Sequence, residues 1–299
     1  MFKRILFGYA GDRAGRDAAV LAEQLARLCG SKLSVAFPYH PMLATVPGEV
    51  SEQRVRDELR SLLGDSPILA DASYHWANSS WPIRALHELA DWEGADLIVF
   101  GAAPVRLERR HVSVMERMVH GAPCAVALAP AGYADGAAHQ LGSIGVGFAD
   151  TNEGHAAVAL ARDVAQRAGG RVQLIAGAGL SPELLSYAAG SPALPEAEAE
   201  IYAETKAAAE RVAAEQLAGG ECEFDVRRGD ACRLLLEASE RLDLLVLGSR
   251  AYGPIRHALL GGVSAAVMRG AHCPVLVVPR GVEVPGAVPS AAAPASAER

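Results

Sequence analysis

The chain has 299 residues, of which 51% are hydrophobic and 21% charged, and it carries a net charge of −7. Such an acidic balance gives no electrostatic reason to bind nucleic acid or an anionic membrane surface. No apolar run approaches the roughly 20 residues of a membrane span, and no signal-peptide pattern opens the chain, so we expect a cytoplasmic protein with neither kind of partner.

The first half of the chain predicts strands that alternate with helices. Leu21, Leu25 and Leu28 recur at helical spacing, which indicates a helix over 14–29 after an opening strand at 3–9. Further strands are expected at 32–37, 68–76, 96–101 and 124–129, with helices at 49–63, 82–93 and 112–120. This alternation is typical of a parallel sheet with helices on both faces.

The second half predicts the same order of elements. Strands are expected near 143–148, 171–176, 222–227, 243–248 and 274–278, with helices near 153–168, 193–218, 230–240 and 262–270. The segment 131–141, which contains glycines and small residues, is expected to be a linker between the halves. The Pro-, Ala- and Ser-rich stretch 282–299 predicts a disordered tail.

Sequence landmarks of the first half return in the second, in the same order and about 140 to 150 residues later. The strand ending at Gly8 corresponds to the strand ending at Gly147, segment 95–101 to segment 242–248, and segment 121–128 to segment 270–277. We infer two copies of one domain, since two domains of this size fit the usual range. The expected boundaries are 1–132 and 142–281.

The segment 244–264 carries the strongest functional signal. An aliphatic run ends at Gly248, a loop containing Gly253 follows, and the adjacent Gly261 and Gly262 precede a helix-compatible stretch. This pattern is typical of a buried parallel strand leading into a loop whose backbone amides face a phosphate. It predicts a nucleotide-type ligand at the carboxyl end of the strand, and it does not by itself predict catalysis.

With these motifs both halves resemble universal stress protein domains, and the whole chain resembles the tandem universal stress proteins common in actinobacteria. The resemblance covers about residues 1–280. It implies that each half is a Rossmann-like, doubly wound α/β domain, with a five-stranded parallel sheet in the order 3-2-1-4-5. Members of that family bind ATP or act in the stress response without a ligand, and no strong enzymatic activity defines them.

Nucleotide-binding members of that family carry Gly, two residues, Gly, nine residues and then Gly-Ser or Gly-Thr. In the second half Gly248 and Gly261 match this motif, whereas Ala251 stands at the second glycine and Gly253 lies two residues beyond it. Gly262 replaces the Ser or Thr, so the resemblance implies that a side-chain hydroxyl to phosphate is lost there.

The family's adenine-reading Asp corresponds to Ala149, and Asp150 follows one residue later. We expect Asp150 either to miss the base or to cap the next helix, and Ser264 to supply a hydroxyl at a helix N-cap. The site residues that follow from the resemblance are Gly147, Ala149, Gly177, Leu247, Gly248, Arg250, Gly253, Gly261, Gly262, Val263 and Ser264.

The first half has lost more of the motif. Ala10 stands at its Asp position, and no glycine occurs between Gly101 and Gly121. Pro104 also removes one amide donor from the loop. We therefore expect the first half to be structural, with a degenerate binding loop.

The sequence thus predicts a non-catalytic stress-response protein that binds an adenine nucleotide, ATP or else ADP or AMP, with low affinity in its second half. Mg²⁺ can accompany the nucleotide. Two alternatives stay open: a scaffold or interaction protein that keeps the fold without a ligand, and a slow ATPase. No general base or metal-binding carboxylate is evident beside the loop. The five cysteines lack metal-ligand spacing and are expected to be reduced, and Cys124 and Cys273, at equivalent places of the two halves, are expected to be buried.

The closing strands of the two halves, 125–128 and 274–278, are apolar along their length. Each lies at a sheet edge if the strand order is the one that the resemblance implies, and an apolar edge is an association surface. We expect the two strands to pair within the chain as an internal pseudo-dimer, because the linker is short. Pairing between chains, which gives a homodimer, is the alternative.

Overall fold

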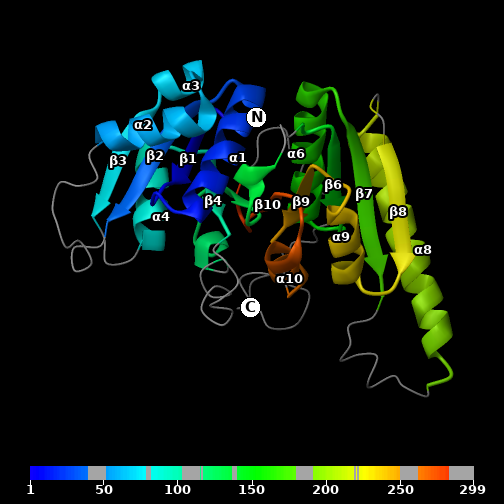
Figure 1. Cartoon of the computed structure of the whole chain (residues 1–299). Helices are drawn as coiled ribbons and strands as arrows, with labels where there is room; N and C mark the ends of the chain where they lie inside the picture. Colours follow the sequence, from blue (N-terminus) through cyan, green and yellow to red (C-terminus); the bar gives the residue numbers. More distant parts are fainter. Residues whose placement is uncertain are drawn as a thin grey trace.

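A computed structural model describes residues 1–39, 52–78, 82–102, 115, 117–136, 140–179, 191–218, 220, 222–249 and 262–282. In this part of the chain a single sheet carries helices on both faces (Figure 1). The first unit contains β1 (Arg4–Gly8), α1 (Arg13–Cys29), β2 (Lys32–Tyr39), α2 (Glu52–Leu63), α3 (Pro67–Ala70), β3 (Ser73–Asn78), α4 (Pro82–Glu93), β4 (Leu97–Gly101) and β5 (Ala125–Ala129). After the short 3-10 helix η2 (Tyr133–Asp135), the second contains β6 (Ser143–Gly147), α6 (Asn152–Ala168), β7 (Arg171–Ala178), α8 (Leu194–Gln216), β8 (Cys222–Arg228), α9 (Ala231–Ser239), β9 (Leu244–Gly248), α10 (Gly262–Gly270) and β10 (Val275–Val278).

The described strands follow the order β3-β2-β1-β4-β5-β10-β9-β6-β7-β8. Read from its outer edge, each unit has the order 3-2-1-4-5, and every neighbouring pair within a unit is parallel. The expected α/β fold, two tandem doubly wound units of Rossmann-like topology, is therefore confirmed. Fusion of the two sheets makes the whole sheet mixed, because the strands at the junction run in opposite directions.

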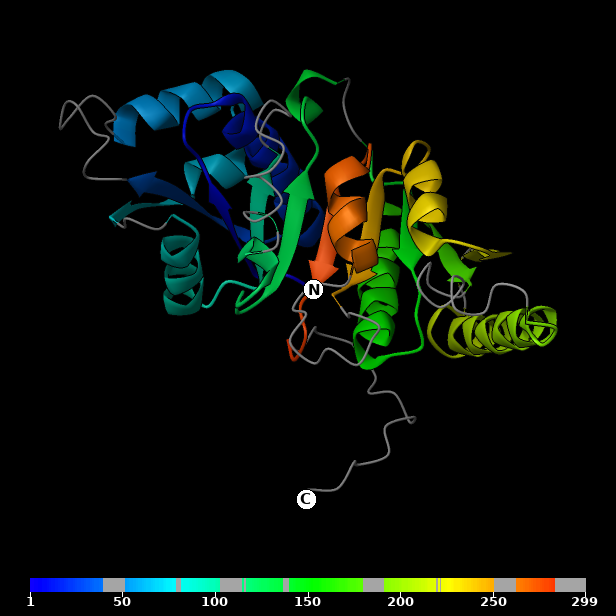
Figure 2. The same ribbon diagram turned by 90° about the horizontal axis from the view of Figure 1, so that it is seen from below.

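The closing strands β5 and β10 join the two units. They pair antiparallel, with Val126 opposite Val277 and Leu128 opposite Val275, and lie side by side at the centre of the molecule (Figure 2). These four side chains are buried, so the strands expected to be sheet edges form the middle of one continuous sheet. The expected pairing within the chain is confirmed, and β3 and β8 are left as the outer strands.

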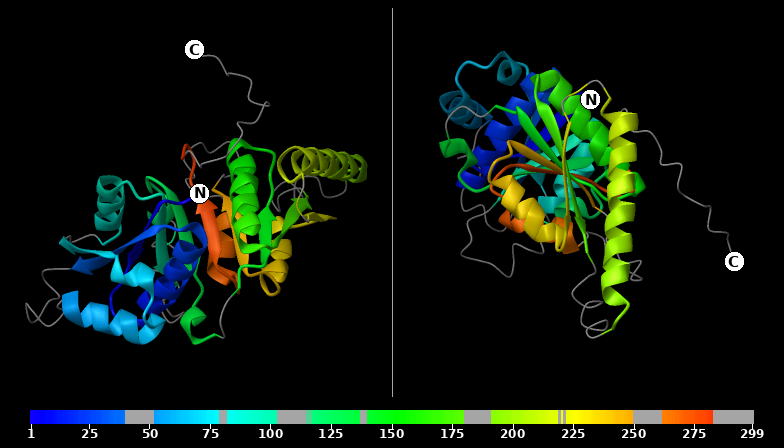
Figure 3. Two further views of the ribbon diagram at one scale, coloured as in Figure 1. Left: turned by 90° about the horizontal axis from the view of Figure 1, so that it is seen from above. Right: turned by 90° about the vertical axis from the view of Figure 1, so that its right-hand side faces the viewer.

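Alternating side chains of the central strands fill two cores, one on each face of the sheet. Ile5 and Phe7 belong to the core beneath α1 and α6, whereas Leu6 belongs to the core beneath α4, α9 and α10. Figure 3 shows α8 on one face of β7 and β8, with α9 and α10 on the other. Each large apolar side chain buried in this way stabilises the fold by about 1.5–3 kcal/mol.

Equivalent helices begin in the same way in the two units. The Asp12 side chain accepts from the amide of Gly15 and caps α1, and the Thr151 side chain accepts from the amide of Gly154 and caps α6. The expectation that Asp150 caps the second of these helices is therefore wrong. A hydroxyl one residue later has the extended backbone that an N-cap requires.

Part of the expected linker at 131–141 packs against α1. The buried Asp17 carboxylate accepts from the amides of Gly132 at 2.9 Å and Ala134 at 2.7 Å. The Tyr133 hydroxyl donates to the Gln24 side chain at 2.6 Å. These bonds fasten residues 132–134 to α1, so this part of the connection is a packed turn.

Three other expected segments agree with the structure only in part or lie partly outside the described residues. The strand expected at 68–76 begins only at Ser73, because Pro67 opens one turn of helix there. Of the short helix expected at 112–120, residues 115 and 117–119 are helical, and 112–114 and 116 lie outside the described residues. Nearly all of the expected tail at 282–299 also lies outside them.

Candidate functional site

The predicted site residues at the ends of β6 and β9 lie close together in the second unit. β6 lies between β7 and β9, and Gly147 pairs in register with Leu247 on one side and with Ile175 on the other. The connections run in opposite directions from β6 and β9, so a crevice opens at their carboxyl ends, where ligands bind in open α/β sheets. Gly147, Leu247 and Gly248 are therefore close neighbours.

The first turn of α10 stands beside this crevice. Gly262 is exposed, and a Cβ placed on it would meet nothing within 4 Å. Val263 is 38% exposed, whereas Ser264 is buried and its hydroxyl donates to the Gly248 carbonyl at 2.9 Å. Ser264 thus lies inside the helix and binds a strand carbonyl, which corrects its expected position at the N-cap.

Ser249 is a candidate that the motif did not single out. Its amide donates to the Val278 carbonyl at 3.0 Å, and its side chain is buried, with the residue 2% exposed. Within the described part of the chain its hydroxyl has no hydrogen-bond partner. An unsatisfied buried hydroxyl costs about 1–3 kcal/mol. Ala102 makes the same backbone bond at the equivalent position of the first unit. The serine in place of that alanine is a difference between the two repeats that could have identified Ser249.

The glycines that end β4 and β9 have a packing role. A Cβ on Gly101 would lie 1.9 Å from the Ala14 carbonyl oxygen, and one on Gly248 would lie 2.9 Å from the Glu153 carbonyl carbon. Ala14 and Glu153 belong to the first turns of α1 and α6. In both units the missing Cβ of this glycine allows a helix to pack closely on the sheet. Gly248 would therefore be needed whether or not a phosphate binds.

Gly147 and Gly177 also lie against protein atoms. A Cβ on Gly147 would come within 2.4 Å of Leu247 and 3.1 Å of Leu235, and one on Gly177 would come within 2.5 Å of the Ala231 Cα. Leu235 and Ala231 belong to α9. Among the predicted glycines that the structure describes, Gly262 alone faces open space.

Ala149 and Asp150 follow β6, and the Asp150 carboxylate is held by two helices. Its Oδ1 lies 2.7 Å from Nε2 of the buried His155 on α6, and its Oδ2 accepts from Arg211 on α8 at 2.8 Å. The Gln216 side-chain amide lies 3.1 Å from His155 Nδ1. If Gln216 donates there, Nε2 carries the proton that faces Asp150.

Arg250, Gly253 and Gly261, which the sequence assigns to the site, lie outside the described residues, as does Ala251. Pro104 of the first unit is likewise outside them. Within the described ranges, His, Cys, Asp and Glu side chains form no group of three or more suited to a metal ion. No described helix combines the length and hydropathy that crossing a bilayer requires.

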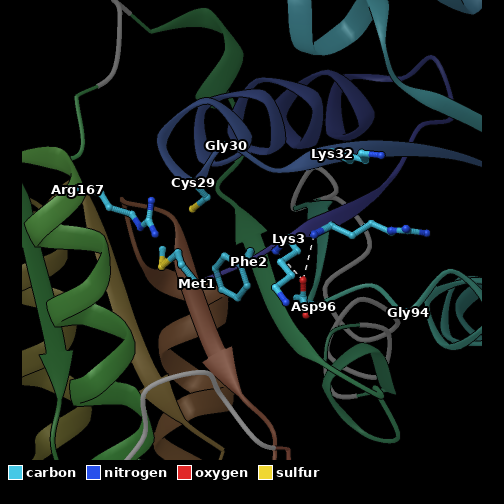
Figure 4. A pocket seen from close by; sticks show the side chains of 10 residues that line it. Met1, Phe2, Lys3, Cys29, Gly30, Lys32, Gly94, Asp96 and Arg167 are labelled. Carbon is cyan, nitrogen blue, oxygen red and sulfur yellow. Dashed lines mark hydrogen bonds between the residues drawn. The ribbon is translucent and has the colours of Figure 1, made fainter.

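A pocket of about 600 Å³ lies at the other end of the strands, against the amino ends of β1 and β4 (Figure 4). There the Asp96 carboxylate accepts from the amides of Lys3 at 2.6 Å and Arg4 at 3.0 Å. Asp243 makes the equivalent bonds in the second unit. The repeated Asp therefore ties strand starts together and has a structural role away from the crevice.

The two repeated cysteines are buried, as expected. Burial raises the pKa of the Cys124 and Cys273 thiols to about 12. A thiol with so high a pKa is protonated at neutral pH and is a poor nucleophile.

The sequence profile of the Universal stress protein family matches residues 1–130 and 141–279. The chain belongs to this family. A universal stress protein of Mycobacterium tuberculosis is 26% identical over 300 residues, covering 92% of this chain and 99% of the relative. Among solved structures, a universal stress protein from Archaeoglobus fulgidus superposes with a TM-score of 0.60 at 17% identity, covering 93% of this chain and 96% of the other. A functionally unknown protein from Pseudomonas aeruginosa reaches 0.67 at 18% identity, covering 93% and 92%.

These two structural likenesses extend over both units, so they concern the tandem universal stress protein fold and not a single domain. At such identities they speak for the fold alone. The chemistry of the site must come from the residues of this chain.

Proposed function

We propose that this universal stress protein binds an adenine nucleotide, ATP or else ADP or AMP, in the crevice of its second unit, and that it acts without catalysis. The observation that carries the proposal is the buried hydroxyl of Ser249, directly after β9, which has no hydrogen-bond partner among the described residues. A polar group in that state calls for a partner, and a ligand phosphate or ribose at the strand ends would supply one.

The start of α10 supports the same placement. The first amides of a helix have no acceptor within the helix, and the helix dipole favours an anion there. Gly262 leaves that end open, because no described atom lies where its Cβ would be. Mg²⁺ would then reach the site together with the nucleotide phosphates, without a preformed metal group.

Low affinity is part of the proposal. Ala149 provides no carboxylate for the base, and the neighbouring Asp150 is bound to His155 and Arg211. A hydrogen bond to a charged group contributes about 1.5–3 kcal/mol. We therefore propose weak binding with little discrimination between adenine and guanine.

A ligand-free scaffold is the second candidate. It is favoured by the close contact of Gly248 with Glu153, which explains the strand-end glycine without a phosphate. A slow ATPase would need a base or metal group that the proposal does not invoke.

Calorimetric titration of ATP into the full chain separates the two candidates. We expect one weak site per chain, weakened about tenfold or more in Ser249→Ala. Ser34→Ala is the matched control, since Ser34 is a buried serine of the first unit whose hydroxyl binds Glu93. Binding should survive in that variant. Absence of binding by the wild-type chain would favour the scaffold, and equal affinity of the wild type and Ser249→Ala would remove the role of Ser249.

A further inference from the structure

The two outer strands of the sheet, which lie at opposite ends of the molecule, differ in charge (Figure 1). β8 has seven residues and includes Glu223, Asp225, Arg227 and Arg228, whereas β3 has six residues and carries no Asp, Glu, Lys or Arg. Charged side chains on an edge strand oppose pairing with another chain. The β8 edge is protected in this way and the β3 edge is not.

Exposed aromatic side chains flank the β3 edge on both faces. Trp76 on β3 is 51% exposed and Trp92 on α4 is 75% exposed. The His75 ring packs edge-on against Trp92, with ring centroids 5.7 Å apart. Successive side chains of a strand point to opposite faces, so Trp76 lies on one face of the edge and the pair of His75 and Trp92 on the other. This is apolar surface that a monomer would leave in water.

Of the two helices around this edge, α2 carries three acidic and three basic residues, whereas α4 carries Arg84 against Glu88, Asp91 and Glu93. On α2, Arg56 pairs with Glu52 at 2.6 Å and Arg54 with Glu58 at 3.0 Å. On α4, Arg84 pairs with Glu88 at 2.7 Å. Glu93 is bound by Arg4 at 3.0 Å, and the exposed Asp91 has no ion pair among the described residues. A second copy of the α2 surface therefore meets balanced charge, and the α4 surface adds one negative charge from Asp91.

We propose that β3 pairs antiparallel with β3 of a second copy of this chain, giving a twofold-symmetric dimer with a sheet continuous through both molecules. The chain already joins two of its own uncharged edges antiparallel, at β5 and β10. A twofold interface brings the same patch together from each copy. Two copies of an uncharged strand can pair without charge repulsion between them. Trp76 of each copy then lies on the same face of the joint sheet and is covered.

Sedimentation velocity of the full chain, over a roughly hundredfold concentration range around micromolar, tests the interface. The wild type is expected to be a dimer that dissociates on dilution, and Trp76→Lys is expected to be a monomer throughout. Phe224→Lys is the matched control, because Phe224 is 48% exposed on the opposite edge strand, and it should remain a dimer. Trp92→Lys, on the surface of a helix, weakens the dimer without changing the edge strand and serves if Trp76→Lys does not fold.

Tryptophan fluorescence provides an independent readout. The chain has three tryptophans, and two of them, Trp76 and Trp92, are exposed at this edge. The emission maximum should shift to longer wavelength as the dimer dissociates. A wild type that is monomeric at every concentration overturns the proposal. A dimer that Trp76→Lys and Trp92→Lys both retain, or one that dissociates with no change in emission, also overturns it.

Discussion

The Ser264 hydroxyl donates to the Gly248 carbonyl at 2.9 Å and so joins the first turn of α10 to the last residue of β9. The next residue along the chain, Ser249, has a buried hydroxyl that lacks a partner among the described residues. Two serines of one site therefore stand in opposite states. Ser264 stabilises the arrangement of strand and helix. Ser249 lowers the stability of the nucleotide-free protein, and a ligand that bonds to its hydroxyl would offset that loss.

Replacement of these serines by alanine is expected to change the free energy of unfolding in opposite directions. Ser264→Ala removes a satisfied hydrogen bond and should lower it by about 1 kcal/mol. Ser249→Ala removes an unsatisfied buried hydroxyl and should raise it by about 1 kcal/mol. Urea unfolding of the nucleotide-free chain measures both changes. A loss of stability in Ser249→Ala would mean that its hydroxyl has a partner in the folded protein.

Alanine at Gly101, which ends β4, and alanine at Gly262, which begins α10, should also change stability in opposite directions. A Cβ at Gly101 would overlap the Ala14 carbonyl oxygen, so Gly101→Ala should cost about 3 kcal/mol or more. Gly262→Ala places a methyl group in open space at a helix start and should raise stability by about 0.5 kcal/mol. Thermal unfolding distinguishes them. Similar melting temperatures for the two variants would contradict the packing role of Gly101.

The fold was predictable because its signals are local and repeated. The aliphatic runs before Gly101 and Gly248 gave the buried strands, and the spacing of Leu21, Leu25 and Leu28 gave the face of α1 that packs on them. The pairing of β5 with β10 followed from two apolar edges and a short connection. The helical turn at Pro67 was missed because the apolar residues after it also suit a strand.

The site was less predictable, because the same residue type serves packing and binding. Sequence gives no means to distinguish Gly248, which admits Glu153 of α6, from Gly262, which faces open space. The partners of Asp150 come from α6 and α8, and Arg211 lies 61 residues further along the chain. A contact of that kind depends on tertiary structure, so no spacing rule could reveal it.

The Asp150 contacts lead to a further prediction. Asp150→Ala leaves the Nε2 side of the buried His155 ring without its carboxylate and should lower the free energy of unfolding by about 1–3 kcal/mol. Arg211→Ala removes an exposed ion pair and should cost less than about 1 kcal/mol. Chemical denaturation of the two variants provides the comparison. An equal cost for both would show that the bond to His155 adds nothing beyond the surface pair.

The buried thiols predict a loss of stability in alkali. Burial raises the pKa of Cys124 and Cys273 to about 12 in the folded protein, whereas a cysteine thiol of the unfolded chain has a pKa of about 8.5. The unfolded chain therefore releases protons that the folded chain keeps, so the free energy of unfolding falls as the pH rises from about 8.5 towards 12. Urea unfolding at several pH values should show a steeper fall in the wild type than in the double variant Cys124→Ala, Cys273→Ala. Identical slopes would contradict the burial of these thiols.

Hydrogen exchange of the full chain with and without saturating ATP tests most directly the claim that the second unit holds the nucleotide. We predict slower exchange at the amides of Gly248 and Ser249 and across residues 262–264, with no change at the equivalent strand end of the first unit, Gly101 and Ala102. Exchange that ATP leaves unchanged throughout the chain, or protection confined to the first unit, would contradict the account.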